Sequence, residues 1–182
     1  MKTSVDGIEL SESAHPRKKI LIDTMILCYA HDRLSPHNPA ASLIMKAAIN
    51  GDIDAHLAYQ NLAEFYSVVT GRRVERPIAP AQASRLSRLY EECVDIKFLL
   101  PTEEAYREAL NTAEDRQVTG GDIFDCILAY TARGRVDTIW TDNTKHFTPY
   151  PFLKTENPLK WEWKEGDLHE IGATSHSDRE IN

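Results

Sequence analysis

Apolar positions along the chain form short continuous runs, separated by longer segments with a different spacing. The first run, at 18–22, ends at Asp23. Three further runs, at 54–59, 95–101 and 136–141, are similarly short and largely apolar. Runs of this length are typical of strands buried in a sheet, so the pattern predicts four strands.

Between these runs, apolar residues recur every three or four positions, which is the spacing of one helix face. The alternation of such helices with short strands predicts an α/β fold, in which a parallel sheet carries helices on both faces. The predicted helices are 39–49, 60–70, 80–94, a helix that Thr102 caps, and the segment between Gly121 and Gly134.

Three of the helices have an apolar stripe that we expect to be buried. Asp125 lies at the margin of the stripe that begins with Phe124, about 100° from Phe124 around the helix. The stripes are Leu62, Phe65, Tyr66 and Val69; Ala83, Leu86, Leu89, Tyr90 and Cys93; and Phe124, Ile127, Leu128 and Thr131.

The length of 182 residues suits one domain. Polar, aperiodic ends suggest an extension at 1–17 and a tail at 161–182 around a domain at 18–160. No apolar run reaches the ~18 residues of a membrane span, and the start lacks the apolar centre of a secretory signal. We therefore expect no membrane partner.

The three cysteines, Cys28, Cys93 and Cys126, are an odd number in apolar segments. This usage indicates buried thiols in a reducing compartment, not disulfides or a zinc site, so the expected location is cytoplasmic. The net charge of −7 argues against a protein that coats nucleic acid. It does not exclude a nuclease, because clustered active-site carboxylates add negative charge themselves.

Acidic residues follow two of the predicted strands. Asp23 ends the first strand, Asp142 ends the last, and Asp125 lies in the first turn of the preceding helix. The carboxyl ends of parallel strands share one edge of a sheet, so these carboxylates are expected to converge. Two carboxylates ~4 Å apart repel by about 4 kcal/mol at an effective dielectric near 20. Such a group needs protons or a cation, and oxygen ligands favour Mg²⁺ or Mn²⁺.

Each acid also has a simpler interpretation. An acid after a strand is often the first loop residue, and Asp142 begins a stretch with turn-forming residues. Asp122 follows two glycines and is expected to be a helix N-cap. The coincidence of three acids at one edge favours the metal site over these separate explanations.

Four sequence blocks, taken together, resemble PIN-domain proteins of the VapC toxin type. They are ILIDTMILCYA, LAYQNLAEFYSVVT, DCILAYTARGRVDTIWTDNTKHF and FLKTENPL, in order from residue 20 to about 160. The resemblance implies a three-layer α/β/α fold with a mostly parallel central sheet. It also implies RNA cleavage that depends on Mg²⁺ or Mn²⁺, a small antitoxin as partner, and a homodimer.

The resemblance carries the family's four acidic positions over to this chain. They match Asp23, Glu64, Asp125 and Asp142, with Asn143 as an alternative for the last, and imply that these acids are catalytic metal ligands. On a helical wheel Glu64 lies opposite the predicted buried stripe, so only the resemblance assigns it a role. The residues expected to support the ligands are Thr24, Asn143 and Asp122.

Two positions depart from the family pattern. Met25 stands where the family often has Asn, and His146 stands where it usually has Asp before Phe147. Neither departure removes a principal ligand, but both are expected to weaken the support around the ligands.

The first hypothesis is a metal-dependent endoribonuclease, the toxin of a toxin–antitoxin pair, which hydrolyses RNA with metal-activated water. Asp23 and Asp125 would bind the ion directly, with Glu64 and Asp142 completing its surroundings. The residues suggested for holding the RNA backbone are Arg72, Arg73 and Arg76.

Two rival hypotheses differ in class. A phosphatase with Asp23 as nucleophile needs a second Asp two residues later, where Met25 stands. A catalytically weak PIN-like module that binds RNA or an antitoxin is compatible with Met25 and His146. The four intact acids argue against this module.

Overall fold

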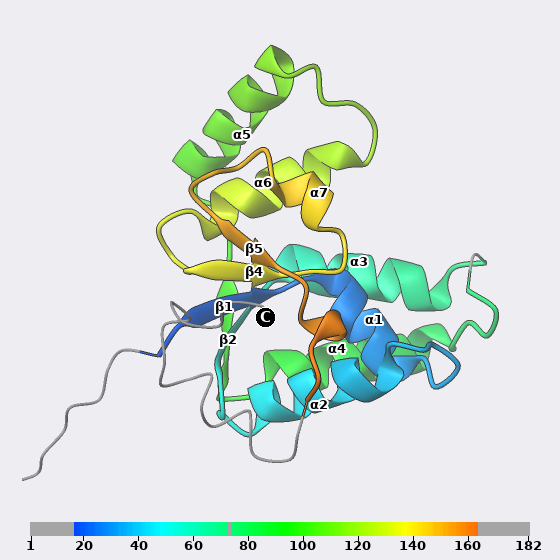
Figure 1. Ribbon diagram of the computed structural model, residues 1–182. Helices are drawn as coiled ribbons and strands as arrows, with labels where there is room; N and C mark the ends of the chain where they lie inside the picture. Colours follow the sequence, from blue (N-terminus) through cyan, green and yellow to red (C-terminus); the bar gives the residue numbers. More distant parts are fainter. Residues whose placement is uncertain (1–16, 73, 164–182) are drawn as a thin grey trace, which may run out of the picture.

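The computed structural model describes residues 17–72 and 74–163, which form one sheet with helices on both sides (Figure 1). The strands are β1 (Lys19–Ile22), β2 (Asp54–Ala58), β3 (Ile96–Leu99), β4 (Thr138–Trp140) and β5 (Lys154–Glu156). The helices are α1 (Thr24–His31), α2 (Asn38–Ile49), α3 (Tyr59–Thr70), α4 (Pro80–Glu91), α5 (Glu103–Asp115), α6 (Asp122–Ala132), α7 (Thr144–Phe147) and the 3₁₀ helix η1 (Pro158–Lys160).

The sheet has the strand order β3-β2-β1-β4-β5, and all neighbouring strands are parallel. Strand β1 is central, with Ile20 paired to Ala55 of β2 and to Thr138 of β4. The backbone N–H of Asp23 donates to the carbonyl of Trp140, 3.0 Å away, so the ends of β1 and β4 lie side by side. The predicted α/β fold is confirmed.

The sheet separates two hydrophobic cores. Ile20 and Ile22 of β1 belong to the core under α1, α2, α3 and α4, whereas Leu21 belongs to the core under α5 and α6. This division follows from the alternation of side chains along a strand. Figure 1 shows the two helix groups on opposite sides of the sheet, which gives the expected three layers.

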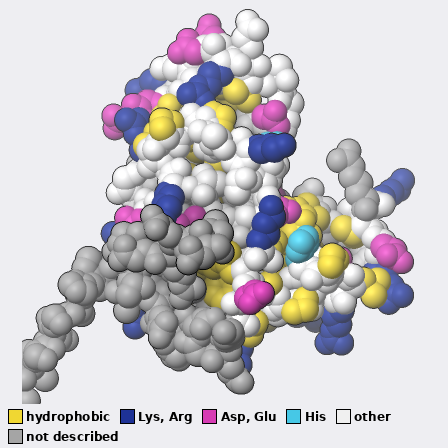
Figure 2. Space-filling model, in the orientation of Figure 1, with side chains coloured by type: hydrophobic (Ala, Val, Ile, Leu, Met, Phe, Trp, Pro, Cys, Tyr) yellow, Lys and Arg dark blue, Asp and Glu magenta, His cyan; other side chains and the backbone are white. Residues whose placement is uncertain are grey.

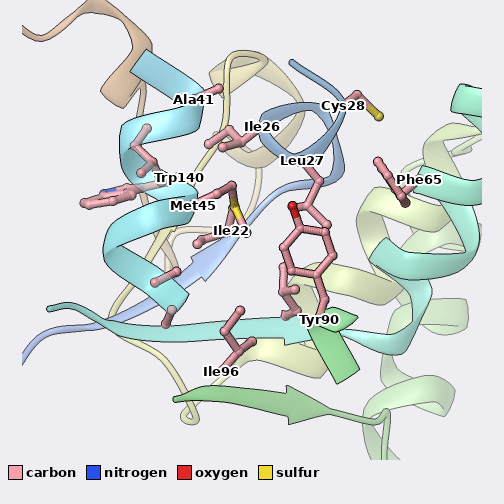
Figure 3. Close-up of a cluster of buried hydrophobic side chains, with 14 of the residues drawn as sticks. Ile22, Ile26, Leu27, Cys28, Ala41, Met45, Phe65, Tyr90, Ile96 and Trp140 are labelled. Carbon is pink, nitrogen blue, oxygen red and sulfur yellow. The ribbon is translucent and has the colours of Figure 1, made fainter. Parts of the chain in front are cut away.

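The larger core fixes the direction of α1. Ile26 and Cys28 of α1 are buried in this core together with Phe65 of α3 and Tyr90 of α4 (Figure 3). The rings of Phe65 and Tyr90 meet edge to face, with centroids 6.3 Å apart. Because α1 begins directly after Asp23, this packing also fixes how the chain leaves the strand end.

Some predicted buried stripes are wrong in part. Leu89 is 64% exposed, Phe124 is 52% exposed and Tyr66 is 36% exposed. On α6, Leu128 and Thr131 of the predicted stripe are buried, and Cys126 and Ala129 are buried beside them. Periodicity locates a helix but does not say which of two mixed faces is buried.

The segment after β4 contains elements that the apolar pattern does not predict. Strand β5 has the sequence KTE and pairs only with β4, at the edge of the sheet. Beyond it, Trp161 and Trp163 pack against Trp140, with ring centroids 5.5 and 6.1 Å away. The domain limits at 17/18 and 160/161 stay predictions, and residues 1–16 and 164–182 lie outside the described residues.

Cys28 and Cys126 are buried, Cys93 is partly buried, and none of the three forms a disulfide within the described chain. Among residues 17–72 and 74–163, no helix combines the length and the apolar character that crossing a membrane requires.

The exposure pattern generates a stability prediction. Phe65 is fully buried and Leu89 is 64% exposed, although both lie on predicted apolar stripes. We expect Phe65→Ala to lower the free energy of unfolding by about 3–5 kcal/mol, because it leaves a cavity in the larger core. Leu89→Ala is the control, with an expected change within about 0.5 kcal/mol. Urea unfolding measures both, and equal losses would contradict the assignment of these two faces.

Candidate metal-binding site

Asp23 lies at the carboxyl end of the central strand and is the N-cap of α1. Its Oδ1 accepts from the backbone N–H of Thr24 at 2.7 Å, and its Oδ2 accepts from Thr141 Oγ1 at 2.7 Å. The side chain is almost fully enclosed, with 8% of the residue exposed. Both carboxylate oxygens are thus oriented by neutral donors.

Burial raises the pKa of Asp23 to about 7, although the hydrogen bonds from Thr141 and Thr24 oppose this shift. The negative charges of Asp125 and Asp142 raise the pKa further, so these three carboxylates act on one another. Negative charges of the same group also raise the pKa of a buried thiol nearby. Burial raises the pKa of Cys28 to about 12, and Asp23, Glu64 and Asp142 add to that effect.

Asp142 follows β4 and is oriented from α1. The hydroxyl of Tyr29 donates to Asp142 Oδ2 at 2.6 Å, and burial together with this bond raises the pKa of Tyr29. The loop after β4 is held as well, since Asn143 N–H donates to Thr141 Oγ1 at 3.0 Å. Asn157 Nδ2 donates to the carbonyl of Asp142 at 3.3 Å. Asp142 therefore lies beside Asp23 in a fixed loop.

Glu64 reaches the site from α3. Its Oε2 accepts from Thr24 Oγ1 at 2.8 Å, and its Oε1 accepts from Gln60 Nε2 at 2.7 Å. Asn61 Nδ2 in turn donates to Thr24 Oγ1 at 3.1 Å, while Asn61 Oδ1 caps the backbone N–H of Ala58 at 2.7 Å. Glu64 is half-buried, so its position opposite the apolar stripe does not make it a solvated surface residue.

Asp125 reaches the site from α6, on the other side of the sheet. Gln60 Nε2 donates to the carbonyl of Phe124 at 2.8 Å and joins α3 to the start of α6. His146 Nδ1 lies 2.6 Å from Asp125 Oδ2. Burial raises the pKa of Asp125, and the contact with His146 opposes that shift.

Asp122 does not have its predicted capping role. The N-cap of α6 is Gly121, and Asp122 is the exposed first residue of the helix. Its carboxylate belongs to a group with Asp125 and His146, whose possible ligand atoms all lie within 4.8 Å of one another. The two acids at the start of α6 therefore lie close to His146 of α7.

The suggested role of three arginines in RNA binding stays a prediction. Arg72 and Arg76 are exposed in the loop after α3, and Arg73 lies outside the described residues. On the face seen in Figure 2, basic side chains are scattered among acidic ones and form no continuous stripe.

The donor set fits a hard divalent cation. Asp23, Glu64, Asp125 and Asp142 offer carboxylate oxygens, and within the described residues no lysine or arginine forms an ion pair with any of them. Carboxylates gathered without a neutralising side chain are the ligands that Mg²⁺ and Mn²⁺ prefer.

Sequence reasoning missed the side chains that orient these acids. They come from α1, α3, α7 and the residue directly after β4, and the apolar pattern gives no sign of them. They are Tyr29, Gln60, Asn61, Thr141 and His146. Except for the contact of Gln60 with Glu64, these contacts join residues that are distant along the chain.

Solved structures with the same fold identify the architecture. No protein-family model matches the sequence, and no curated protein sequence matches it. VapC20 of Mycobacterium tuberculosis, a sarcin–ricin loop cleaving toxin, superposes with a TM-score of 0.57 at 8% identity, over 72% of this chain and 95% of that one. The chain has the fold of VapC toxins.

Two complexes give the same result. VapBC2 of Rickettsia felis, bound to a DNA fragment from its promoter, has a TM-score of 0.53 at 18% identity, over 76% of this chain and 97% of the other. FitAcB of Neisseria gonorrhoeae has a TM-score of 0.52 at 19% identity, over 78% and 99%. The PIN-type fold that the sequence blocks imply is therefore confirmed.

The raised pKa of Asp23 in this VapC-like fold generates a prediction. An aspartate ordinarily titrates near 3.8, so the folded state holds this proton more tightly than the unfolded state does. Ionisation between pH 4 and 8 therefore destabilises the fold. Without metal, we expect Asp23→Asn to raise the free energy of unfolding at pH 8 by on the order of 2–4 kcal/mol, and by much less at pH 5.

Urea unfolding in EDTA at both pH values measures this effect. Asp137→Asn is the control for the loss of one charge, because Asp137 is exposed at the opposite end of β4. A gain from Asp23→Asn that is equal at pH 5 and pH 8 would contradict the raised pKa.

Proposed function

We propose that this protein is a metal-dependent endoribonuclease and the toxin of a toxin–antitoxin pair. The observation that carries the proposal is the buried carboxylate of Asp23, which has two neutral donors and lies beside the charges of Asp125 and Asp142. This arrangement does not stabilise the fold by itself, since a buried charge without a partner costs several kcal/mol.

In this proposal Mg²⁺ or Mn²⁺ is held by Asp23 and Asp125, with Glu64 and Asp142 completing the site. The bound cation supplies Lewis acidity, which activates a water for attack on a phosphodiester and neutralises charge on the phosphate. The protein's own contribution is orientation. Thr24 holds both Asp23 and Glu64, through its backbone N–H and its hydroxyl, so one residue sets the positions of two acids.

Asp142 is oriented independently of this pair. Its partner Tyr29 belongs to α1, whose buried face is packed in the larger core. The acids are therefore positioned before any ligand binds, and little rearrangement has to accompany binding.

RNA is the substrate in this proposal, and the similar VapC20, described as a sarcin–ricin loop cleaving toxin, supports a nuclease. Single strands and loops are the proposed targets, because their bases are accessible to a protein. Arg72, Arg73 and Arg76 are proposed to hold the backbone near the end of α3. With a net charge of −7, such contacts have to be local.

We further propose a small antitoxin as partner, a homodimer as the assembly, and the cytoplasm as the location. Similar structures that are VapBC complexes support the antitoxin, and the free cysteines suit a reducing compartment. The nuclease domain would span 18–160, between the extension at 1–17 and the tail at 161–182.

Cleavage of total cellular RNA by the purified, partner-free protein tests the function. We expect discrete products with Mg²⁺ or Mn²⁺, none in EDTA, and a loss of at least about 100-fold in rate for Asp23→Asn and Asp125→Asn. Asp137→Asn, remote from the site, controls for the loss of charge. Circular dichroism establishes that each variant is folded.

The other outcomes separate the alternatives. Products that persist in EDTA and in both variants would contradict the proposal. Metal binding by a folded protein that cleaves no RNA would instead favour the catalytically weak module that binds RNA or an antitoxin.

The shared role of Thr24 gives a second prediction. Thr24→Val removes the hydroxyl that donates to Glu64 but keeps the side-chain shape and the backbone N–H. We expect it to lower Mg²⁺ affinity about 10- to 100-fold, a loss typical of residues that orient ligands. Thr24→Ser retains the hydroxyl and is the matched control. Isothermal titration calorimetry measures both, and equal affinities for the two variants would contradict the role.

A further inference from the structure

His146 stands directly before Phe147, where the VapC-type pattern usually has Asp. It lies on α7, directly after the loop that carries Asp142, and the neighbouring Phe147 is 1% exposed and anchors the helix in the smaller core. His146 Nδ1 lies 2.6 Å from Asp125 Oδ2, and the two side chains are 43% and 28% exposed. The imidazole is thus part of the group of acids and remains accessible from solvent.

The spacing of this group is only slightly wider than that of the ligand atoms around one ion. Possible ligand atoms of Asp122, Asp125 and His146 all lie within 4.8 Å of one another. Around an octahedral ion with bonds of about 2.1 Å, neighbouring ligand atoms are about 3 Å apart and opposite ones about 4 Å apart. The charge of Asp125 also acts on the buried Asp23, so this group is continuous with the strand-end site.

We propose that His146 is a ligand of the metal in this site and that its nitrogen makes the site prefer a first-row transition ion, such as Mn²⁺, over Mg²⁺. The inference rests on the proposed function and specifies its metal. Mg²⁺ takes oxygen ligands almost exclusively, whereas an imidazole nitrogen raises the affinity for transition ions. To bind a metal, Nδ1 has to lose the proton that it donates to Asp125, so that its lone pair is free for the ion; the neutral ring then carries its one proton on Nε2.

A different role would explain the same contact. His146 could only orient Asp125, by donating from Nδ1 to Oδ2, as histidines and carboxylates do around metal sites. The two roles differ in one observable property, because only a ligand brings its nitrogen into direct contact with the ion.

Pulsed EPR of the full-length, untagged, RNA-free protein, loaded with less than one equivalent of Mn²⁺, distinguishes them. We expect a nitrogen hyperfine coupling in the wild type that disappears in His146→Gln. His37→Gln is the matched control and should retain the coupling, since His37 is the histidine that packs on Tyr29, with ring centroids 5.0 Å apart. Activity plays no part in this measurement.

Isothermal titration with Mn²⁺ and Mg²⁺ gives an independent measure. We expect the preference for Mn²⁺ over Mg²⁺ to fall at least about tenfold in His146→Asp, which replaces the nitrogen with an oxygen ligand. Unfolding in urea with EDTA establishes that this variant is folded.

The outcomes separate this inference from the proposed function. Mn²⁺ that binds without any nitrogen coupling, or with a coupling that persists in His146→Gln, would overturn the role of His146 and leave the metal-dependent nuclease standing. An unchanged Mn²⁺ preference in His146→Asp would overturn it too. A folded wild type that binds no Mn²⁺ would overturn both proposals.

Discussion

The burial of one carboxylate at the end of the central strand constrains the rest of the site. Asp23 is only 8% exposed there, and its two oxygens accept hydrogen bonds from Thr24 and Thr141 instead of pairing with a cationic side chain. This arrangement brings together the start of α1 and the end of β4, and it works only if β1 and β4 are neighbours. The hydrogen bonds that hold Asp23 therefore depend on the strand order of the sheet.

The framework of the site was predictable because it depends on local patterns. Short apolar runs locate the strands, and the parallel arrangement that they predict brings Asp23 and Asp142 to one edge. The polar strand β5 was not predicted from apolar runs, because an edge strand does not need buried side chains on both faces. The exposure of Phe124 and Leu89 was not predicted either, because helical periodicity does not specify whether another element covers a given face.

The details of the site depend on contacts between residues far apart in the chain. Tyr29 and Asp142 are 113 positions apart, and Thr24 and Glu64 are 40 apart. Neither pair has a sequence pattern of its own, so Glu64 could be assigned only through the resemblance to a family. The hydrogen bonds of Thr24 explain physically what the helical wheel did not, namely why this glutamate is held against the sheet edge.

The acids are not all held in the same way, and this difference bears on how a cation would enter. Asp23, Glu64 and Asp142 receive hydrogen bonds from hydroxyl, amide or backbone donors that leave other lone pairs on the carboxylates. Asp125 is instead in contact with a side chain that is itself able to bind a metal. A cation at this site would therefore have oriented carboxylate oxygens of Asp23, Glu64 and Asp142 on one side. On the other side, the imidazole of His146 already occupies an oxygen of Asp125. In the proposal made above, the metal preference depends on whether that imidazole competes with the ion or joins its ligands, so a position where the chain departs from the family pattern is the one expected to tune the metal chemistry.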